Sequence, residues 1–126
     1  MANELILIVE DNEKNLKLAR SVLKFGGFRT IEATNAERAL DLAHEQTPDL
    51  ILMDIQLPGM DGIAALKALK EDTSTRDIRV VALTAFAMKG DRERFLEAGF
   101  AGYLMKPIDV KAFPGQIRDL CDRAGD

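Results

Sequence analysis

The sequence lacks the features that mark secreted, membrane-bound or nucleic-acid-binding proteins. Cys121 is its only cysteine, which excludes an internal disulfide and is typical of a reducing compartment. No apolar run approaches the length of a membrane span, and the start Met-Ala-Asn-Glu has none of the basic or apolar segments of a signal peptide. The net charge of −4 argues against direct contact with nucleic acid, which normally requires a basic face. We therefore expect a cytoplasmic protein with no direct nucleic-acid or membrane partner.

The length and composition predict one ordinary folded domain. With 126 residues, 47% of them hydrophobic and 30% charged, the chain can bury a core without metal or disulfide support. It is too short for a second domain of usual size. We therefore expect a single domain over residues 1–126. No output domain follows the last predicted helix, which favours a stand-alone protein, although a domain cut from a larger protein would look the same.

Apolar segments of strand length alternate along the chain with segments of helical spacing. Continuous runs rich in β-branched residues predict strands covered on both faces, and a half-polar run predicts an edge strand. The buried runs are Leu5–Val9, Leu50–Met53, Val80–Leu83 and Tyr103–Met105, and the edge run is Phe28–Ala33. The alternation, with right-handed crossovers, predicts a flavodoxin-like, doubly wound (βα)5 α/β fold. This is a three-layer sandwich whose parallel five-stranded sheet has the order 2-1-3-4-5.

Polar residues before the helical segments predict where the helices begin. The candidate capping residues are Asn12, Asn35, Asp61 and Asp91. In the helix after Asp91, the spacing predicts that Phe95, Leu96 and Ala98 face inward. Proline is tolerated in the first turn of a helix but not in its interior. The last helix should therefore begin near Phe113 or Pro114, or be kinked there.

Each buried run ends in a polar residue that can take part in chemistry. Glu10 and Asp11 follow the first run, Asp54 the second, Thr84 the third and Lys106 the fourth. In an open parallel sheet these positions meet in one crevice outside the carboxyl ends of the strands. The carboxylates are the ligands that Mg²⁺ prefers, and Asp54 at a strand end can attack phosphorus to form an acyl phosphate. Each residue alone has an ordinary structural explanation, whereas the set predicts a magnesium and phosphoryl site.

The segments that carry these residues resemble the receiver domain of response regulators in two-component signalling. The resemblance covers essentially the whole chain, and its motifs are Ile8–Asn12, Leu52–Gly62, Leu83–Ala85 and Tyr103–Pro107. The segment Thr84–Asp91 further resembles single-domain regulators of the cell-cycle type and the receivers of hybrid kinases.

The resemblance implies a role for each residue of the site. Asp54 would accept a phosphoryl group from a histidine kinase or histidine phosphotransfer protein, as in a phosphorelay. Asp11, Asp54 and the backbone carbonyl of Gln56 would bind Mg²⁺, for which Mn²⁺ can substitute, and Glu10 would assist through water. Lys106 would pair with the phosphoryl group. The chain would then be no classical enzyme, since it would catalyse only its own phosphorylation and slow autodephosphorylation.

The resemblance also implies a switch. Thr84 would move toward the phosphoryl group and Tyr103 would turn inward, which changes the surface of the fourth helix, fifth strand and fifth helix. That surface would contact a downstream protein target or a second copy in a weak or phosphorylation-dependent homodimer. The Lys106–Pro107 peptide bond would be cis. Gln56 and Phe86 would flank the path of the hydrolytic water, and the apolar Phe86 predicts slow loss of phosphate.

Three other interpretations fit the predicted site residues less well. A receiver-like interaction domain that is never phosphorylated would not need the complete set of site residues. A Mg²⁺-dependent phosphatase with an aspartyl nucleophile usually has a second aspartate two residues on, which the segment Glu10–Glu13 lacks. A flavodoxin that binds FMN would have its phosphate repelled by the acidic crevice.

Overall fold

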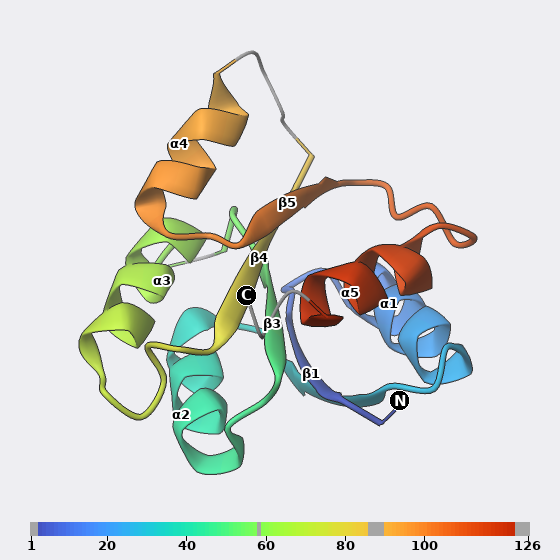
Figure 1. The fold of residues 1–126 in the computed structure, drawn as a ribbon, viewed down its shortest axis with the longest axis horizontal. Helices are drawn as coiled ribbons and strands as arrows, with labels where there is room; N and C mark the ends of the chain where they lie inside the picture. The colour runs from blue at the N-terminus through green and yellow to red at the C-terminus, as the bar shows by residue number, and fades with distance from the viewer. Residues whose placement is uncertain (1–2, 58, 86–89, 123–126) are drawn as a thin grey trace.

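A five-stranded parallel sheet forms the centre of the described residues, with helices on both of its faces (Figure 1). The computed structural model describes residues 3–57, 59–85 and 90–122. The strands are β1 (Leu5–Val9), β2 (Arg29–Ala33), β3 (Leu50–Asp54), β4 (Arg79–Thr84) and β5 (Gly102–Met105). The helices are α1 (Glu13–Phe25), α2 (Ala36–Gln46), α3 (Gly62–Glu71), α4 (Asp91–Ala98) and α5 (Phe113–Asp122). The order β2-β1-β3-β4-β5, parallel throughout, confirms the predicted doubly wound α/β fold.

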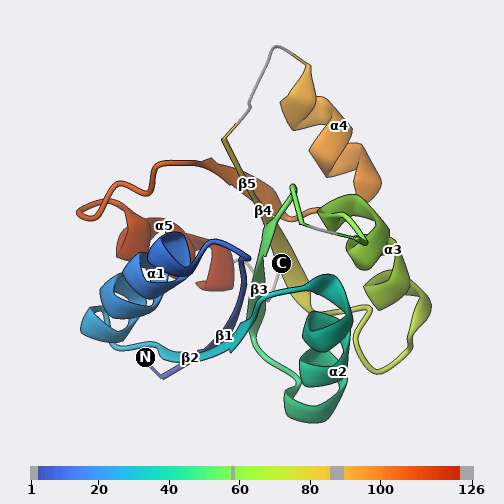
Figure 2. The same ribbon diagram turned by 180° about the vertical axis from the view of Figure 1, so that it is seen from behind.

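The helices divide into two groups, one on each face of the sheet. Figures 1 and 2 show α2, α3 and α4 on one side of the strands and α1 and α5 on the other. Each group encloses its own apolar core against the sheet, because successive strand residues point to opposite faces. The strand β3 at the centre is buried along its whole length. Within the described residues, no helix is long and apolar enough to cross a membrane.

Local capping explains where three of the helices begin. The side chains of Asn12, Asn35 and Asp61 each accept a backbone N–H three residues on, at 3.1, 2.8 and 2.8 Å. These bonds satisfy one of the free N–H groups that every helix start exposes. The three predicted caps are therefore confirmed, and they fix the turns that leave the carboxyl ends of β1, β2 and β3.

The start and the orientation of α4 differ from the prediction. The chain enters this helix through Gly90, whose positive φ of 94° suits a glycine, and Asp91 is the first helical residue instead of the cap. Phe95 is buried as predicted, but Leu96 is 45% exposed and Ala98 is exposed as well. A short helix beside the edge strand β5 has room to bury only the side chains that point straight at the sheet. Leu96 is left facing solvent.

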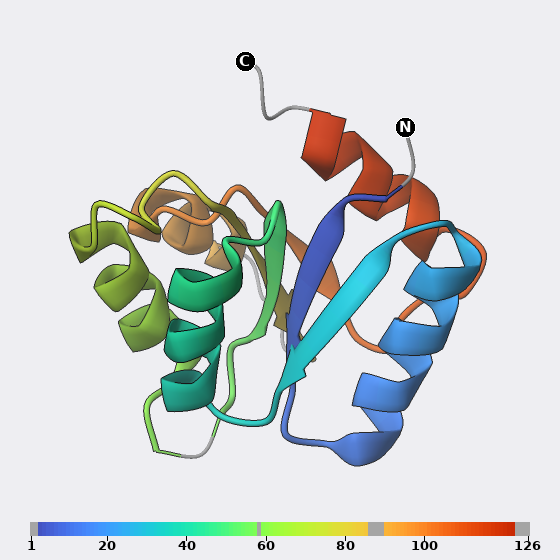
Figure 3. The same cartoon turned by 90° about the horizontal axis from the view of Figure 1, so that it is seen from below.

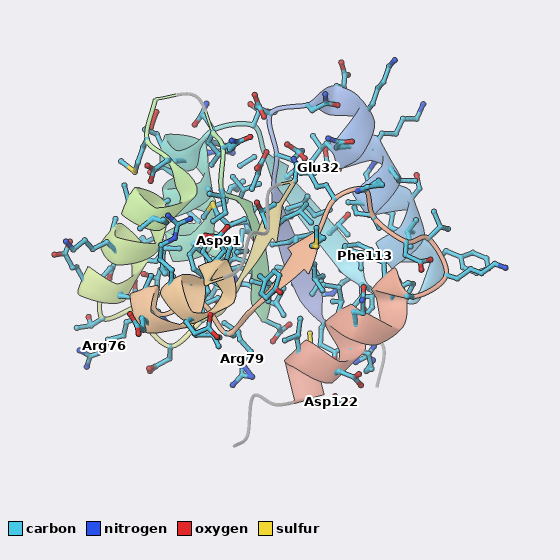
Figure 4. All side chains as sticks on the ribbon, turned by 90° about the horizontal axis from the view of Figure 1, so that it is seen from above. Glu32, Arg76, Arg79, Asp91, Phe113 and Asp122 are labelled. Atoms are coloured by element: carbon cyan, nitrogen blue, oxygen red, sulfur yellow. The ribbon has the colours of Figure 1, made fainter. Side chains whose placement is uncertain are left out.

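The start of α5 matches the prediction from its proline. Figure 4 labels Phe113 and Asp122, the first and last residues of this helix. Pro114 therefore lies in the first turn, where its missing N–H removes no helical hydrogen bond. Gly26, at the end of α1, makes room for it, because a Cβ on Gly26 would lie 3.0 Å from the Cβ of Pro114.

Candidate functional site

The polar residues singled out in the sequence lie at the carboxyl ends of four strands. Glu10 directly follows β1, Asp54 and Thr84 are the last residues of β3 and β4, and Lys106 directly follows β5. Because β1 and β4 both pair with β3, and β4 pairs with β5, the carboxyl ends of these four parallel strands lie side by side. The convergence expected for a parallel sheet is therefore present.

The centre of the site is a cluster of carboxylates around one ammonium group. Oxygen atoms of Glu10, Asp11 and Asp54 lie within 4.8 Å of one another. The Nζ atom of Lys106 is 2.7 Å from Oε1 of Glu10 and 3.0 Å from Oδ2 of Asp54. Glu10 and Asp54 are buried, with 1% and 3% of their surface exposed, whereas Asp11 is exposed. The cluster is therefore closed by protein on one side and open to solvent at Asp11.

The electrostatics of the cluster favour an additional cation. The pKa of Glu10 is raised to about 7, first by burial and then by the neighbouring Asp54, while Lys106 lowers it and offsets part of this rise. Burial alone would lower the pKa of Lys106, but its hydrogen bonds to Glu10 and Asp54 raise this pKa overall. Lys106 thus stays charged at neutral pH. One ammonium group faces three carboxyl groups, and a divalent cation would neutralise the excess.

One backbone N–H and one ammonium group fix the orientation of the Asp54 carboxylate. Its Oδ1 atom accepts the backbone N–H of Gln56 at 3.0 Å, while its Oδ2 atom accepts from Lys106. The backbone N–H of Lys106 in turn donates to the carbonyl oxygen of Thr84 at 2.8 Å. Both oxygen atoms of the Asp54 carboxylate are therefore held by hydrogen bonds, one from a residue just after β3 and one from a residue just after β5.

The remaining predicted residues take different positions around this cluster. Thr84 is buried, with 3% of its surface exposed, and Gln56 is exposed next to Asp54. The Tyr103 ring is half-buried, with its centroid 6.0 Å from that of Phe95. The Lys106–Pro107 peptide bond is cis. Phe86 lies outside the described residues.

A groove lies beside the site, between α4 and α5 and above β5. Its volume is about 730 Å³, and its lining includes Leu96, Tyr103, Met105, Pro107 and Leu120. Two of these side chains are unusually open for apolar residues, Leu96 with 45% and Met105 with 51% of the surface exposed. Exposed apolar surface next to polar residues is typical of protein contacts.

Gly62 is a residue of the site that sequence reasoning missed. It begins α3, directly after the Asp61 cap, and packs against the end of β3. A Cβ at this position would lie 2.8 Å from the carbonyl oxygen of Asp54 and 3.0 Å from Cα of Ile55. Its backbone N–H donates to the Ile55 carbonyl at 3.1 Å. A glycine directly after a helix cap, where other residues favour the helix more, was the available signal.

Substitution of Gly62 by alanine should destabilise the protein by about 1–3 kcal/mol, because the added methyl group meets backbone atoms that cannot move aside cheaply. Urea unfolding measures this change. The matched control is Gly115→Ala in α5, where nothing lies within 4 Å of the added Cβ. That control should gain up to about 1 kcal/mol from helix propensity. Equal gains in both variants would show that the close approach at Gly62 costs nothing.

Comparisons with known proteins agree with this geometry. Residues 6–118 match the family model described as the response regulator receiver domain. The polar-differentiation response regulator DivK of Brucella anthropi is 53% identical over 113 residues, which span 90% of this chain and 92% of that protein. DivK of Brucella ovis is 52% identical over the same length.

Solved structures of receiver domains have the same fold. The receiver domain of the sensor histidine kinase PA1611 from Pseudomonas aeruginosa aligns with a TM-score of 0.84 and 34% identity, over 99% of this chain and 100% of that one. It was crystallised with a magnesium ion coordinated in its active-site cleft. The Francisella response regulator 1452 receiver domain aligns with a TM-score of 0.87 and 26% identity, over 96% and 98% of the two chains.

Proposed function

The chain belongs to the family of response regulator receiver domains of two-component signalling, and on this basis we propose that it is a phosphorylation-controlled switch with Asp54 as the phosphoacceptor. The observation that carries the proposal is the placement of the Asp54 carboxylate. It lies in an acidic cluster, with one oxygen on the backbone N–H of Gln56 and the other on the ammonium group of Lys106. We propose protein partners on both sides of the reaction, namely a histidine kinase or phosphotransfer protein as donor and a downstream target.

The donor set of the site fits Mg²⁺. All three side chains of the cluster offer carboxylate oxygens, the ligand type of this ion, and one of them reaches solvent. Asp11 and Asp54 would bind it directly with the carbonyl oxygen of Gln56, and Glu10 would act through water. Mn²⁺ has the same preference for oxygen ligands and would substitute. When bound, the ion supplies positive charge for the oxygens of a transferred phosphoryl group.

The residues of the chain account for the transfer step. A carboxylate oxygen of Asp54 attacks phosphorus of the donor phosphohistidine, and an O–P bond forms as the N–P bond of the donor breaks. The electron pair of that bond leaves with the donor imidazole. Lys106 stays protonated and balances the charge of the phosphoryl oxygens, while the Gln56 N–H holds the carboxylate in place.

A path from Asp54 to the protein surface runs through Thr84 and Tyr103. Thr84 ends β4, the strand next to β3, and its hydroxyl would bond an oxygen of the phosphoryl group on Asp54. Movement of Thr84 toward the phosphoryl group vacates space near β5, which the half-buried Tyr103 ring fills by turning inward. Tyr103 lines the groove between α4 and α5, so its movement changes that groove. The groove is therefore the proposed surface for a downstream protein or for a second copy.

Incubation with acetyl phosphate followed by intact-mass measurement tests this function. The wild-type chain should gain the mass of one phosphoryl group with Mg²⁺ present and none with EDTA, and hydroxylamine should remove it because the product is an acyl phosphate. No gain in either condition would contradict the proposal and leave an interaction domain that acts without phosphorylation. A stable gain that resists hydroxylamine would place the group on a hydroxyl and exclude Asp54.

A further inference from the structure

The strand β2 forms one edge of the sheet, and a groove runs along it. In Figure 3, β2 lies at the margin of the sheet between α1 and α2, with no other described element in front of it. The groove has a volume of about 450 Å³. Its lining comes from Arg20 and Lys24 of α1, residues 30–32 of β2, and Arg38 and Leu42 of α2. It shares none of its lining with the phosphorylation site.

The backbone of β2 offers hydrogen-bonding groups to this groove. The N–H of Arg29 donates to Glu4 at 2.9 Å, and the carbonyl of Ala33 accepts from Glu10 at 3.0 Å, so both residues point toward β1. Alternate residues of a strand turn their backbone groups to opposite sides. The N–H and C=O groups of Thr30 and Glu32 therefore face outward, and among the described residues no other strand pairs with them.

Three of the four charged side chains that line this groove are basic, although the whole chain is acidic. Glu32 pairs with Arg20 through both of its oxygens, at 2.9 and 2.7 Å. Arg38 is 3.8 Å from Glu45 and more than half exposed. Lys24 is exposed and has no ion-pair partner within the described part of the chain. The groove thus carries positive charge beyond what Glu32 neutralises, in a protein of net charge −4.

We propose that this edge binds an extended, acidic segment of a partner protein, which adds to the sheet as a sixth strand beside β2. Backbone groups of the segment pair with those of Thr30 and Glu32, and this pairing supplies affinity independent of sequence. Successive side chains of the bound segment point alternately toward α1 and toward α2. Carboxylates that point toward α1 meet Lys24, and apolar side chains that point toward α2 contact Leu42.

The charges also determine which occupant fits. A second copy of this chain paired through β2 would bring two sets of Lys24 and Arg38 together, and like charges at a strand edge oppose such pairing. An acidic segment instead gains attraction from the same residues. The inference concerns the unphosphorylated chain, and it does not depend on the proposed function of Asp54.

NMR titration of the ¹⁵N-labelled full chain with a peptide of alternating valine and glutamate tests this inference. The amides of Thr30 and Glu32 should shift and become protected from hydrogen exchange. Those of Arg29, Ile31 and Ala33, which already face β1, should change least. The proposal would be overturned if the changes were even along β2 or if β2 did not change at all. It would also be overturned if raising the protein concentration without peptide gave the same shifts, a result that would assign the edge to a second copy of the chain.

Matched variants and peptides separate strand addition from simple charge attraction. Lys24→Glu should weaken binding of the fluorescein-labelled peptide by roughly fivefold, since it replaces an attraction by a repulsion. Lys17→Glu makes the same charge change on α1 outside the groove lining, and should leave the dissociation constant unchanged. A valine–lysine peptide should not bind. Undiminished binding of a valine–glutamate peptide methylated on alternate backbone nitrogens would exclude strand pairing.

Discussion

An Asp54→Asn variant should gain no phosphoryl group from acetyl phosphate in the presence of Mg²⁺, whereas the wild-type chain should gain one. The amide of asparagine is a far weaker nucleophile than a carboxylate and cannot form an acyl phosphate. It can still accept hydrogen bonds through its oxygen, so the contacts with Lys106 or Gln56 need not be lost. The chemistry should disappear while the fold remains. Intact mass after a fixed incubation time is the direct measurement.

The same variant should be more stable than the wild type when Mg²⁺ is absent. Asp54 is buried beside Glu10, and its charge contributes to the raised pKa of Glu10. Removal of that charge should raise the free energy of unfolding by on the order of 1 kcal/mol. Stabilisation by added Mg²⁺ should shrink at the same time, because a direct ligand is lost. Urea unfolding with EDTA and with Mg²⁺ gives both quantities.

Asp61→Asn is the matched control for these experiments. It makes the same chemical change in the loop after β3, at a helix cap where asparagine is as effective as aspartate. This variant should be phosphorylated like the wild type and should keep its stability. A phosphoryl group on Asp54→Asn, or its loss from Asp61→Asn alone, would move the acceptor away from Asp54.

The second large effect is expected for Lys106→Met. In the absence of Mg²⁺ this variant should lose about 3 kcal/mol of stability, because Glu10 and Asp54 remain buried without their counter-charge. Methionine keeps most of the side-chain volume, so the loss reports charge more than packing. Added Mg²⁺ should restore part of the stability, since it neutralises the same carboxylates. Urea unfolding at a fixed pH, with EDTA or with Mg²⁺, measures both effects.

Lys111→Met provides the comparison for this loss. Lys111 is exposed in the loop before α5, and the structure gives its side chain no ion pair among the described residues. Its substitution should change stability by less than about 0.5 kcal/mol. The double variant Asp54→Asn with Lys106→Met should be more stable than Lys106→Met alone, because the two residues are coupled. Equal stability of Lys106→Met and Lys111→Met in EDTA would contradict the electrostatic account.

The features that could be predicted from the sequence depend on local contacts or on general rules of the fold, whereas those that were missed depend on how neighbouring elements pack. The caps at Asn12 and Asp61 depend on a contact three residues away, and the pattern of one segment is enough to find them. The convergence of Glu10, Asp54 and Lys106 follows from a general rule of parallel sheets, so it could be predicted once the strands were placed. The exposure of Leu96 could not be predicted in this way. The spacing of apolar residues shows that a helix has an apolar side, but it does not show how much of that side the neighbouring elements cover.

Lys106 bonds to residues at the ends of β1, β3 and β4, and its late position in the sequence matters during synthesis of the chain. Its partner Asp54 lies 52 positions earlier, and Glu10 lies near the beginning. As the polypeptide leaves the ribosome from its N-terminus, every carboxylate of the cluster emerges long before the ammonium group that pairs with them. Any sheet that formed before β5 emerged would therefore hold these carboxylates together without the ammonium group that pairs with them.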